Sequence, residues 1–495
     1  MPPHSNDSLA KERPPGGAAT QEADPLLRRI DFRGSGEQRT SNPPGWEAYD
    51  GSVYTAERGY GWLTDLSHSG WDRGESEEII LPDGSRSSPR AMGRPELASW
   101  QGTHQENQPL VFRVDLPDGW YRVTCTSVDP GSTPLPLVNQ RSIKFRAHNA
   151  ILAGPAYGAP LQVGGNQLVE GTGLVEVTEG HLRIVVGDPA YGGWTWSYLG
   201  PWYRGWDAWF GALSHQRYAN NWYQRLTRTV DPGYHSLRFN SLEIEPADEP
   251  ARQSPLIFRD FFNRDDSHDL NSGLPGIASW AQVNLHPAYP DRVRSELSKT
   301  AIALTGPSKG KGAVGIIQRK PSPATGSMRY STRVSLYTGA GSQLHSGSQE
   351  AGLLILGGVD GVSEFNSTFV GVAYDSSSRE TPGWVKYRVG NGRGGYRTDS
   401  EIPDTRLPFR VTEGEYEIIV EHDTDSNTLS RIRINGVDIT DYWAASERQQ
   451  QVSHGLFGMR AFMDAQGSGV SLQQFYWYYR VEDASSAPQH QTRSN

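Results

Sequence analysis

The chain has 495 residues, of which 21% are charged, with 55 Gly, 33 Pro, one Cys and a formal net charge of −9. A length above about 300 residues exceeds what one hydrophobic core supports, so we expect two large domains or several small ones. The acidic balance argues against nucleic acid or an anionic membrane as the main partner, and the lack of a run of about 18 apolar residues argues against membrane insertion.

Residues 1–29 are polar and rich in Pro and Gly, without the apolar segment that a signal peptide needs, so we expect a disordered arm. From residue 30, strand-like runs recur every 8–15 residues with turn residues between them, which is typical of all-β sandwiches. Residues 112–125 alternate on both sides of a Pro-Asp-Gly turn and predict a β-hairpin. The single Cys125 excludes an intrachain disulfide and a CxxC site, and its strand position predicts a small buried thiol.

Motifs between residues 30 and 247 resemble the malectin-like and galactose-binding-like β-sandwich modules that accompany carbohydrate-active proteins. They are DFRG near the start, ERGYGW (57–62), FRVDLPDGWYRVTCTSVDP (112–130), GHLRIVVGD (180–188) and NSLEIEP (240–246). The resemblance implies that Tyr60 and Trp62 are structural and pack near a sheet edge. Trp71 and Asp72, in the same long loop, are candidates for a ligand-binding rim.

An aromatic stretch at residues 191–223, with six Trp and five Tyr, separates the GHLRIVVGD and NSLEIEP strands, which are almost adjacent in the resembling modules. Neither a helical nor a strand period explains these aromatic residues, and Gly and Pro break any long element. Three roles remain open: stacking on a sugar, packing on the body or on the second domain, and contact with a partner subunit. The candidate ligand-binding residues of this loop are Trp194, Trp196, Trp202, Tyr203, Arg204, Trp206, Asp207 and Trp209.

A Pro-rich linker is predicted at residues 248–255, and strand-like runs then continue to residue 483. The opening FFNRDD with Trp280, the pair EYEIIVEHD and LSRIRINGVDI, and the closing GLFGMRAFMD and LQQFYWYYRV resemble the concanavalin A-like jelly-roll group, including laminin-G-like modules, over residues 256–483. Residues 484–495 are expected to form a tail. The predicted fold class is all-β: two β-sandwich or jelly-roll domains, 30–247 and 256–483, with a long aromatic loop inserted in the first.

Charged residues of the second domain do not form the paired-carboxylate motif of a glycoside hydrolase. Glu415, Glu417 and Glu421 partly alternate with apolar residues, which indicates the solvated face of an edge strand. Residues 384–397 form a basic, aromatic patch in an acidic protein. This patch either receives an acidic glycan or is a Gly-turn hairpin with ordinary surface arginines; its residues are Lys386, Tyr387, Arg388, Arg393, Tyr396 and Arg397.

Metal and cofactor motifs are sparse. The acid-rich segment 260–269 is a candidate for a structural calcium ion, although its spacing is not that of an EF-hand loop. The sequence contains no closely spaced His pair for zinc, no GxSxG, no Walker loop and no GxGxxG after a strand, so no other cofactor is expected.

These observations favour a non-catalytic or accessory protein that binds a polysaccharide or oligosaccharide. The first alternative is a glycan lyase or glycoside hydrolase, with its site in the second domain or at the domain interface and no catalytic residue yet named. The second is a structural subunit of a surface or particle complex, in a homo-oligomer or larger assembly, that uses the aromatic loop as a contact. The resemblance implies an extracellular or surface-associated protein, although no signal peptide is visible.

Overall fold

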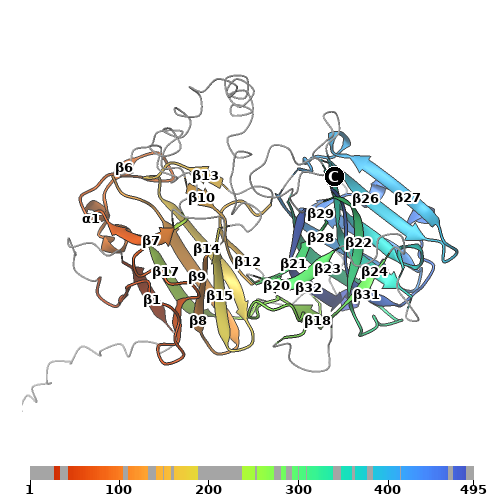
Figure 1. Cartoon of the computed structure of the whole chain (residues 1–495), viewed down its shortest axis with the longest axis horizontal. Coiled ribbons are helices and arrows are strands. Elements are labelled where there is room, and N and C mark those ends of the chain that lie inside the picture. The colour runs from red at the N-terminus through yellow and green to blue at the C-terminus, as the bar shows by residue number, and fades with distance from the viewer. Residues whose placement is uncertain are drawn as a thin grey trace, which may run out of the picture.

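The structure, a computed structural model, confirms the all-β fold class. It describes residues 27–33, 43–103, 110–131, 141–148, 150–157, 161–187, 237–250, 254–272, 280–285, 293–298, 300–307, 309–337, 347–358, 363–375, 383–412, 414–465 and 472–486. Nearly all regular structure in these ranges is strand, arranged in two groups of sheets that lie side by side (Figure 1). Within the same ranges, no helix is long and apolar enough to span a membrane.

Two five-stranded sheets enclose the core of an N-terminal sandwich, which comprises β1 to β17. One sheet has the order β14 (Val169–Val177), β9 (Gly119–Ser127), β17 (Ser241–Ala247), β1 (Arg28–Phe32) and β2 (Glu47–Tyr49). The other has the order β12 (Ala150–Ala153), β11 (Phe145–Ala147), β15 (His181–Val186), β8 (Leu110–Asp115) and β3 (Tyr60–Trp62). A small three-stranded sheet has the order β16 (Leu237–Phe239), β7 (Ser99–Thr103) and β4 (Gly70–Asp72). Two further pairs are β10 (Arg141–Ile143) with β13 (Leu161–Val163), and β5 (Ile79–Ile80) with β6 (Arg86–Ser87). The short helices are α1 (Pro89–Met92) and η1 (Pro95–Leu97).

Aromatic rings fill the centre of this sandwich. The ring centroids of Phe32 and Phe112, from the two facing sheets, lie 4.9 Å apart. Trp62 is fully buried and its Nε1 donates to Gln101 Oε1 at 2.8 Å, so a polar atom in the core has its partner. The expectation that Tyr60 and Trp62 are structural is confirmed, as is the burial of the Cys125 thiol.

The predicted hairpin at residues 112–125 is wrong, because its two strands lie in opposite sheets. β8 pairs with β3 and β15, whereas β9 pairs with β14 and β17. Both strands point alternate apolar side chains inward, and Val114 and Val123 are buried in the same core. The Pro-Asp-Gly turn therefore carries the chain from one sheet to the other. Alternation is the same for a hairpin and for two facing strands, so it does not distinguish them.

The C-terminal sandwich, β18 to β32, has two larger antiparallel sheets around a second core. The first has the order β20 (Arg294–Ser298), β21 (Ala301–Thr305), β32 (Gln473–Asp483), β23 (Ser327–Tyr337), β28 (Gly414–Asp423), β29 (Thr428–Ile434) and β30 (Val437–Asp438), with β18 (Leu256–Asp260) also on β32. The second has the order β19 (Trp280–Asn284), β22 (Gly310–Gln318), β31 (Leu456–Ala465), β24 (Gly347–Gly357), β25 (Thr368–Asp375), β26 (Gly383–Gly390) and β27 (Tyr396–Pro403). The short helices are η4 (Glu364–Asn366), η5 (Asp404–Arg406), η6 (Thr440–Tyr442), α4 (Ala445–Arg448) and η7 (Ala484–Ser486).

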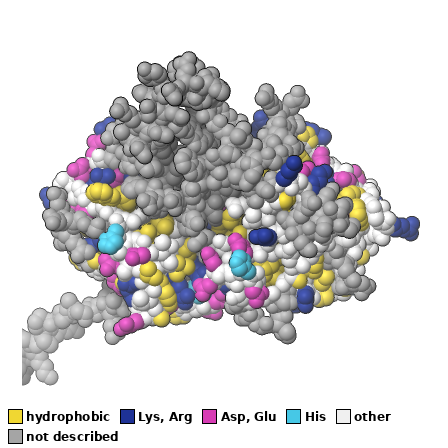
Figure 2. All heavy atoms as spheres, in the orientation of Figure 1, with side chains coloured by type: hydrophobic (Ala, Val, Ile, Leu, Met, Phe, Trp, Pro, Cys, Tyr) yellow, Lys and Arg dark blue, Asp and Glu magenta, His cyan; other side chains and the backbone are white. Residues whose placement is uncertain are grey.

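The two sandwiches meet at the outer face of the sheet that contains β23, β28 and β32. In the described ranges no sheet combines strands from before and after residues 248–255. The contact is made instead by side chains, many of them charged. In Figure 2, acidic and basic side chains are interspersed over the coloured part of the visible face.

Candidate functional site

A buried layer of charge, centred on Glu415 of β28, joins the two sandwiches. Glu415 accepts hydrogen bonds from Arg146 Nη2 at 2.7 Å and Arg333 Nη1 at 3.1 Å, and Lys144 Nζ lies 3.8 Å away. Arg146 and Lys144 belong to the N-terminal sandwich, and the Arg146 guanidinium lies 3.5 Å from the ring centroid of Trp477 on β32. Burial by itself raises the pKa of Glu415, but the three cations hold that pKa below its ordinary value.

The interpretation of Glu415, Glu417 and Glu421 as the solvated face of an edge strand is wrong. β28 lies inside its sheet, between β23 and β29. Glu415 is 0% exposed, and Glu417 accepts hydrogen bonds from Tyr478 Oη at 2.9 Å and from Tyr157 Oη of the N-terminal sandwich at 3.1 Å. The alternation correctly identifies the face turned away from the core, but the N-terminal sandwich covers part of that face.

A second polar contact joins β15 to the segment that follows β18. Arg183 donates to the carbonyl oxygen of Arg264 at 2.6 Å and pairs with Asp265. His148 stacks on Phe261 with ring centroids 5.9 Å apart and an interplanar angle of 26°. Burial lowers the pKa of His148 to about 4, so its ring is neutral at pH 7.

A cleft of about 350 Å³ lies between the sandwiches. Trp120 of β9 and Glu176 of β14 line it from the N-terminal sandwich, and Ser331 and Tyr478 line it from the C-terminal sandwich. Small-ligand sites are usually lined mainly by apolar and aromatic side chains, whereas seven of the thirteen residues that line this cleft are charged. The charged residues of its lining are Arg259, Arg329, Arg433, Arg480, Glu176, Glu417 and Glu482.

Ion pairs hold most of the charges in the cleft. Arg259 hydrogen-bonds to Glu176 from the other sandwich, and Arg480 Nη2 lies 3.7 Å from the same carboxylate. Arg433 differs, because no carboxylate of the described residues lies within 4.0 Å of its guanidinium nitrogens. The remaining pairs are Arg329 with Glu421 at 2.9 Å and with Glu482 at 3.7 Å, Arg480 with Glu482 at 3.6 Å, and Glu417 with Arg333 at 3.3 Å.

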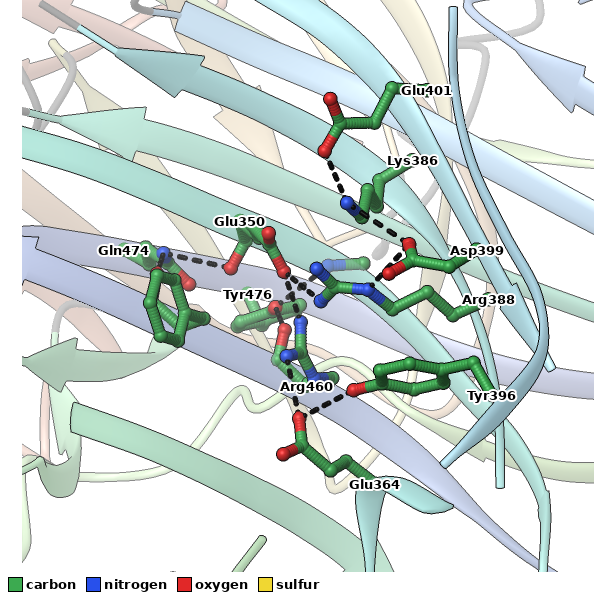
Figure 3. A network of polar contacts seen from close by, with 12 residues as sticks. Glu350, Glu364, Lys386, Arg388, Tyr396, Asp399, Glu401, Arg460, Gln474 and Tyr476 are labelled. Carbon is green, nitrogen blue, oxygen red and sulfur yellow. Dashed lines mark hydrogen bonds and ion pairs between the residues drawn. The ribbon is translucent and has the colours of Figure 1, made fainter. Parts of the chain in front are cut away.

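The predicted basic patch lies on the other sheet of the C-terminal sandwich, where carboxylates neutralise its inner cations (Figure 3). Lys386 pairs with Glu401 and lies 3.1 Å from Asp399. Arg388 donates to Glu350 at 2.7 Å and to Asp399 at 3.0 Å. Strand pairing thus places carboxylates of β24 and β27 beside Lys386 and Arg388.

The centre of this network is the buried pair of Glu350 and Arg460, 2.5 Å apart (Figure 3). Burial by itself raises the pKa of Glu350, but Arg460 and Arg388 hold it below its ordinary value. Tyr396 Oη donates to Glu364 at 2.7 Å, and both burial and this hydrogen bond raise the pKa of Tyr396. An ionised, fully paired Glu350 and a protonated Tyr396 are poorly suited to be a general acid and a general base, respectively.

The other residues of the patch do not share one surface. Tyr387 is fully buried on the core side of β26, whereas Arg393 and Arg397 are exposed. Binding of an acidic glycan at this patch stays a prediction, which now rests on the two exposed arginines.

The predicted rim residues lie on β4. Trp71 is 54% exposed, and the Arg73 guanidinium lies 5.7 Å from its ring centroid. Asp72 Oδ1 accepts a hydrogen bond from the backbone N–H of Gly74 at 2.9 Å, so this carboxylate shapes a turn. The exposed ring of Trp71 keeps its place as a candidate contact. The predictions for Trp194, Trp196, Trp202, Tyr203, Arg204, Trp206, Asp207 and Trp209 lie outside the described residues.

The acid-rich segment proposed for calcium has other partners. Asp260 accepts hydrogen bonds from Arg264 at 2.8 and 2.9 Å and from Trp280 Nε1 at 2.8 Å, and Asp265 pairs with Arg183. In the part of the chain that the structure describes, no group of three or more His, Cys, Asp or Glu could hold a metal ion.

Sequence reasoning did not single out Trp120, Glu176 or Arg433. Trp120 stands in a quoted motif, DGWYRV, and Arg433 in RIRING, where two arginines alternate with isoleucines. These patterns place both side chains away from their cores. Neither pattern indicates that the two side chains line the same cleft.

Comparisons with known proteins add little about function. No protein-family model and no curated protein match the sequence. A Bacillus subtilis protein, YxiM, is 15% identical with a TM-score of 0.23, over 46% of this chain and 42% of its own length, so this chain matches less than half of that protein. Peanut lectin is 13% identical with a TM-score of 0.26, over 42% of this chain and 97% of its own. The CBM2 module of the evolved Dit protein of Lactobacillus casei BL23 phage J-1 is 11% identical with a TM-score of 0.30, over 47% and 96%. At these values the likenesses carry no argument about function.

Proposed function

We propose that this protein binds carbohydrate in the cleft between its two sandwiches. The observation that carries the proposal is the lining of the cleft, which contains Trp120 together with carboxylates, guanidinium groups and hydroxyls. Sugars present apolar C–H faces to aromatic rings and hydroxyls to paired donors and acceptors. We further propose that the N-terminal sandwich is malectin-like, that the C-terminal one is concanavalin A-like, and that the protein acts outside the cell or on a surface.

An accessory role fits the cleft better than hydrolysis. Glycoside hydrolysis needs a protonated carboxyl group beside the scissile bond and a second carboxylate opposite it. In the cleft, the Glu176 carboxylate is bound by Arg259, and Glu417 accepts hydrogen bonds from Tyr157 and Tyr478. These groups are engaged in holding the two sandwiches together.

Affinity electrophoresis against a panel of soluble polysaccharides tests the proposal. For a polysaccharide that retards the wild type, we expect Trp120→Ala to weaken binding about tenfold, since a ring contact contributes about 1–1.5 kcal/mol. Tyr442→Ala, which removes a ring that is 39% exposed outside the cleft, is the control and should bind normally. Trp71→Ala and Trp206→Ala examine the rim and the aromatic stretch in the same assay.

Two results would contradict the proposal. If no polysaccharide retards the wild type, the protein is not a carbohydrate-binding protein of this kind. If Trp120→Ala binds normally while Trp206→Ala does not, the ligand lies elsewhere. Release of new reducing ends or of unsaturated products during incubation would instead support the enzyme alternative.

A further inference from the structure

We propose that the cleft selects carbohydrate that carries an anionic group, and that Arg433 binds this group. The inference rests on the proposed carbohydrate function and adds the class of sugar. It starts from the difference between Arg433 and the other arginines of the cleft. Arg259, Arg329 and Arg480 each lie within 4.0 Å of a glutamate, as the pairs described above show. No carboxylate of the described residues lies that close to Arg433. Its Nε, like that of Arg480, is also buried without a hydrogen-bond partner among those residues.

The position of Arg433 in the sheet explains why it is unpaired. On β29, Arg431 and Arg433 alternate with the buried Ile432 and Ile434, so both arginines lie on the outer face of the sheet. The cross-strand neighbour of Arg433 on β28 is Ile419, which offers no charge.

The aspartate beside Arg433 is engaged elsewhere. Asp438 is opposite Arg433 on β30, but its carboxylate lies 3.4 Å from Arg431 Nε and accepts a hydrogen bond from Thr440 Oγ1 at 2.5 Å. The fold thus gives one arginine of the strand a partner and leaves its neighbour without one.

An unpaired guanidinium group with a buried donor is costly in a folded protein, because the donor has lost water and gained nothing in return. An anion that arrives from outside would supply the partner that the described residues do not give to Arg433. Guanidinium presents a planar fork of N–H groups that fits the oxygens of a carboxylate or a sulfate ester. Both anions therefore satisfy the chemistry of Arg433.

Trp120 favours an acidic sugar over a bare anion. Its ring lines the same cleft as Arg433, so one ligand can place a ring face on the indole and an anionic substituent on the guanidinium. The protein as a whole has a formal charge of −9 and repels polyanions at long range. Recognition of an acidic glycan therefore depends on a local cation such as Arg433.

The test compares pairs of ligands with the same sugar backbone and different charge. Oligogalacturonate is compared with its methyl ester, and chondroitin sulfate with unsulfated chondroitin, by calorimetry on the full-length protein. We expect at least one charged member to bind about tenfold more tightly than its less charged counterpart. The first pair detects recognition of a carboxylate and the second pair recognition of a sulfate.

Matched variants assign the preference to one residue. Arg433→Gln should abolish the preference for charge, and Arg433→Lys should restore part of it. Arg86→Gln removes the same charge from an exposed side chain of the N-terminal sandwich, outside the cleft lining, and should keep the preference. Because Arg433 has no partner to lose, Arg433→Gln should also leave the melting temperature unchanged or higher, which a structural arginine would not.

The outcomes separate the two proposals. Equal binding of charged and less charged glycans, with dependence on Trp120, overturns this inference and leaves carbohydrate binding standing. A preference that survives Arg433→Gln, or a lower melting temperature of that variant, also overturns it. Failure of every glycan to bind the wild type overturns both.

Discussion

Glu415 shows how much one side chain contributes to the junction of the two sandwiches. Its carboxylate, 0% exposed, balances Arg146 and Lys144 from one sandwich and Arg333 from the other. Replacing such a pair by apolar residues can be neutral, but removing one partner leaves buried charge uncompensated.

Glu415→Gln should therefore destabilise the protein by about 3–5 kcal/mol, because three cations lose their buried anion. The midpoint of urea unfolding measures this loss. Glu47→Gln is the control: this exposed glutamate pairs with Arg28 at 3.2 Å, and such surface pairs contribute less than about 1 kcal/mol. A Glu415→Gln variant as stable as the control would show that the charged layer does not hold the sandwiches together.

At the scale of single elements, β7 depends on close contact with its antiparallel partner β16. A Cβ on Gly102 of β7 would lie 1.6 Å from the carbonyl oxygen of Leu237. Gly102→Ala should thus push the two strands apart and cost about 1–3 kcal/mol.

Gly119→Ala in β9 is the matched control, because its Cβ meets only Tyr121 at 3.7 Å. Thermal unfolding followed by tryptophan fluorescence compares the two variants. Equal melting temperatures would mean that β16 pairs differently from the register in the structure.

The sequence predicts which faces of the strands are buried, but not which strands pair. Alternation identified core residues such as Val114 and Val123, because burial on one face of a strand imposes a period of two. It could not tell that β8 and β9 lie in opposite sheets, since pairing depends on strands distant in sequence. For the same reason, the sequence does not reveal the ion pairs of the basic patch, because strand pairing brings Glu350 to Arg388 and Glu401 to Lys386.

The same limit applies to the candidate site as a whole. The sequence places Arg433 on an outer face, but its lack of a partner follows from Ile419 on the neighbouring strand and from the engagement of Asp438 with Arg431. The cleft itself exists only because two sandwiches meet there. A site made by tertiary packing leaves no local motif in the sequence.

For the whole molecule, the junction between the sandwiches should depend on pH. His148 of the N-terminal sandwich stacks on Phe261, accepts a hydrogen bond from the backbone N–H of Arg183 at 3.2 Å and lies 2.7 Å from the carbonyl oxygen of Glu176. Burial, with a smaller contribution from the charges of His181 and Arg183, lowers its pKa from 6.5 to about 4. Between these values the unfolded chain binds a proton that the folded protein does not, so stability falls as the pH falls.

The difference in free energy of unfolding between the wild type and His148→Asn isolates the contribution of His148. Other groups titrate in the same pH range: burial raises the pKa values of Asp31 and Glu179 to about 7, so these two carboxyl groups make the protein more stable as the pH falls. Asn suits position 148 because the backbone there has a φ of 45°. From pH 7.5 to pH 4 the stability advantage of the wild type over the variant should shrink by about 3 kcal/mol, at 1.36 kcal/mol for each pKa unit. Urea unfolding midpoints at five pH values measure the trend. A stability difference that does not change with pH would show that His148 titrates at its ordinary pKa and that water reaches the contact between His148 and Phe261.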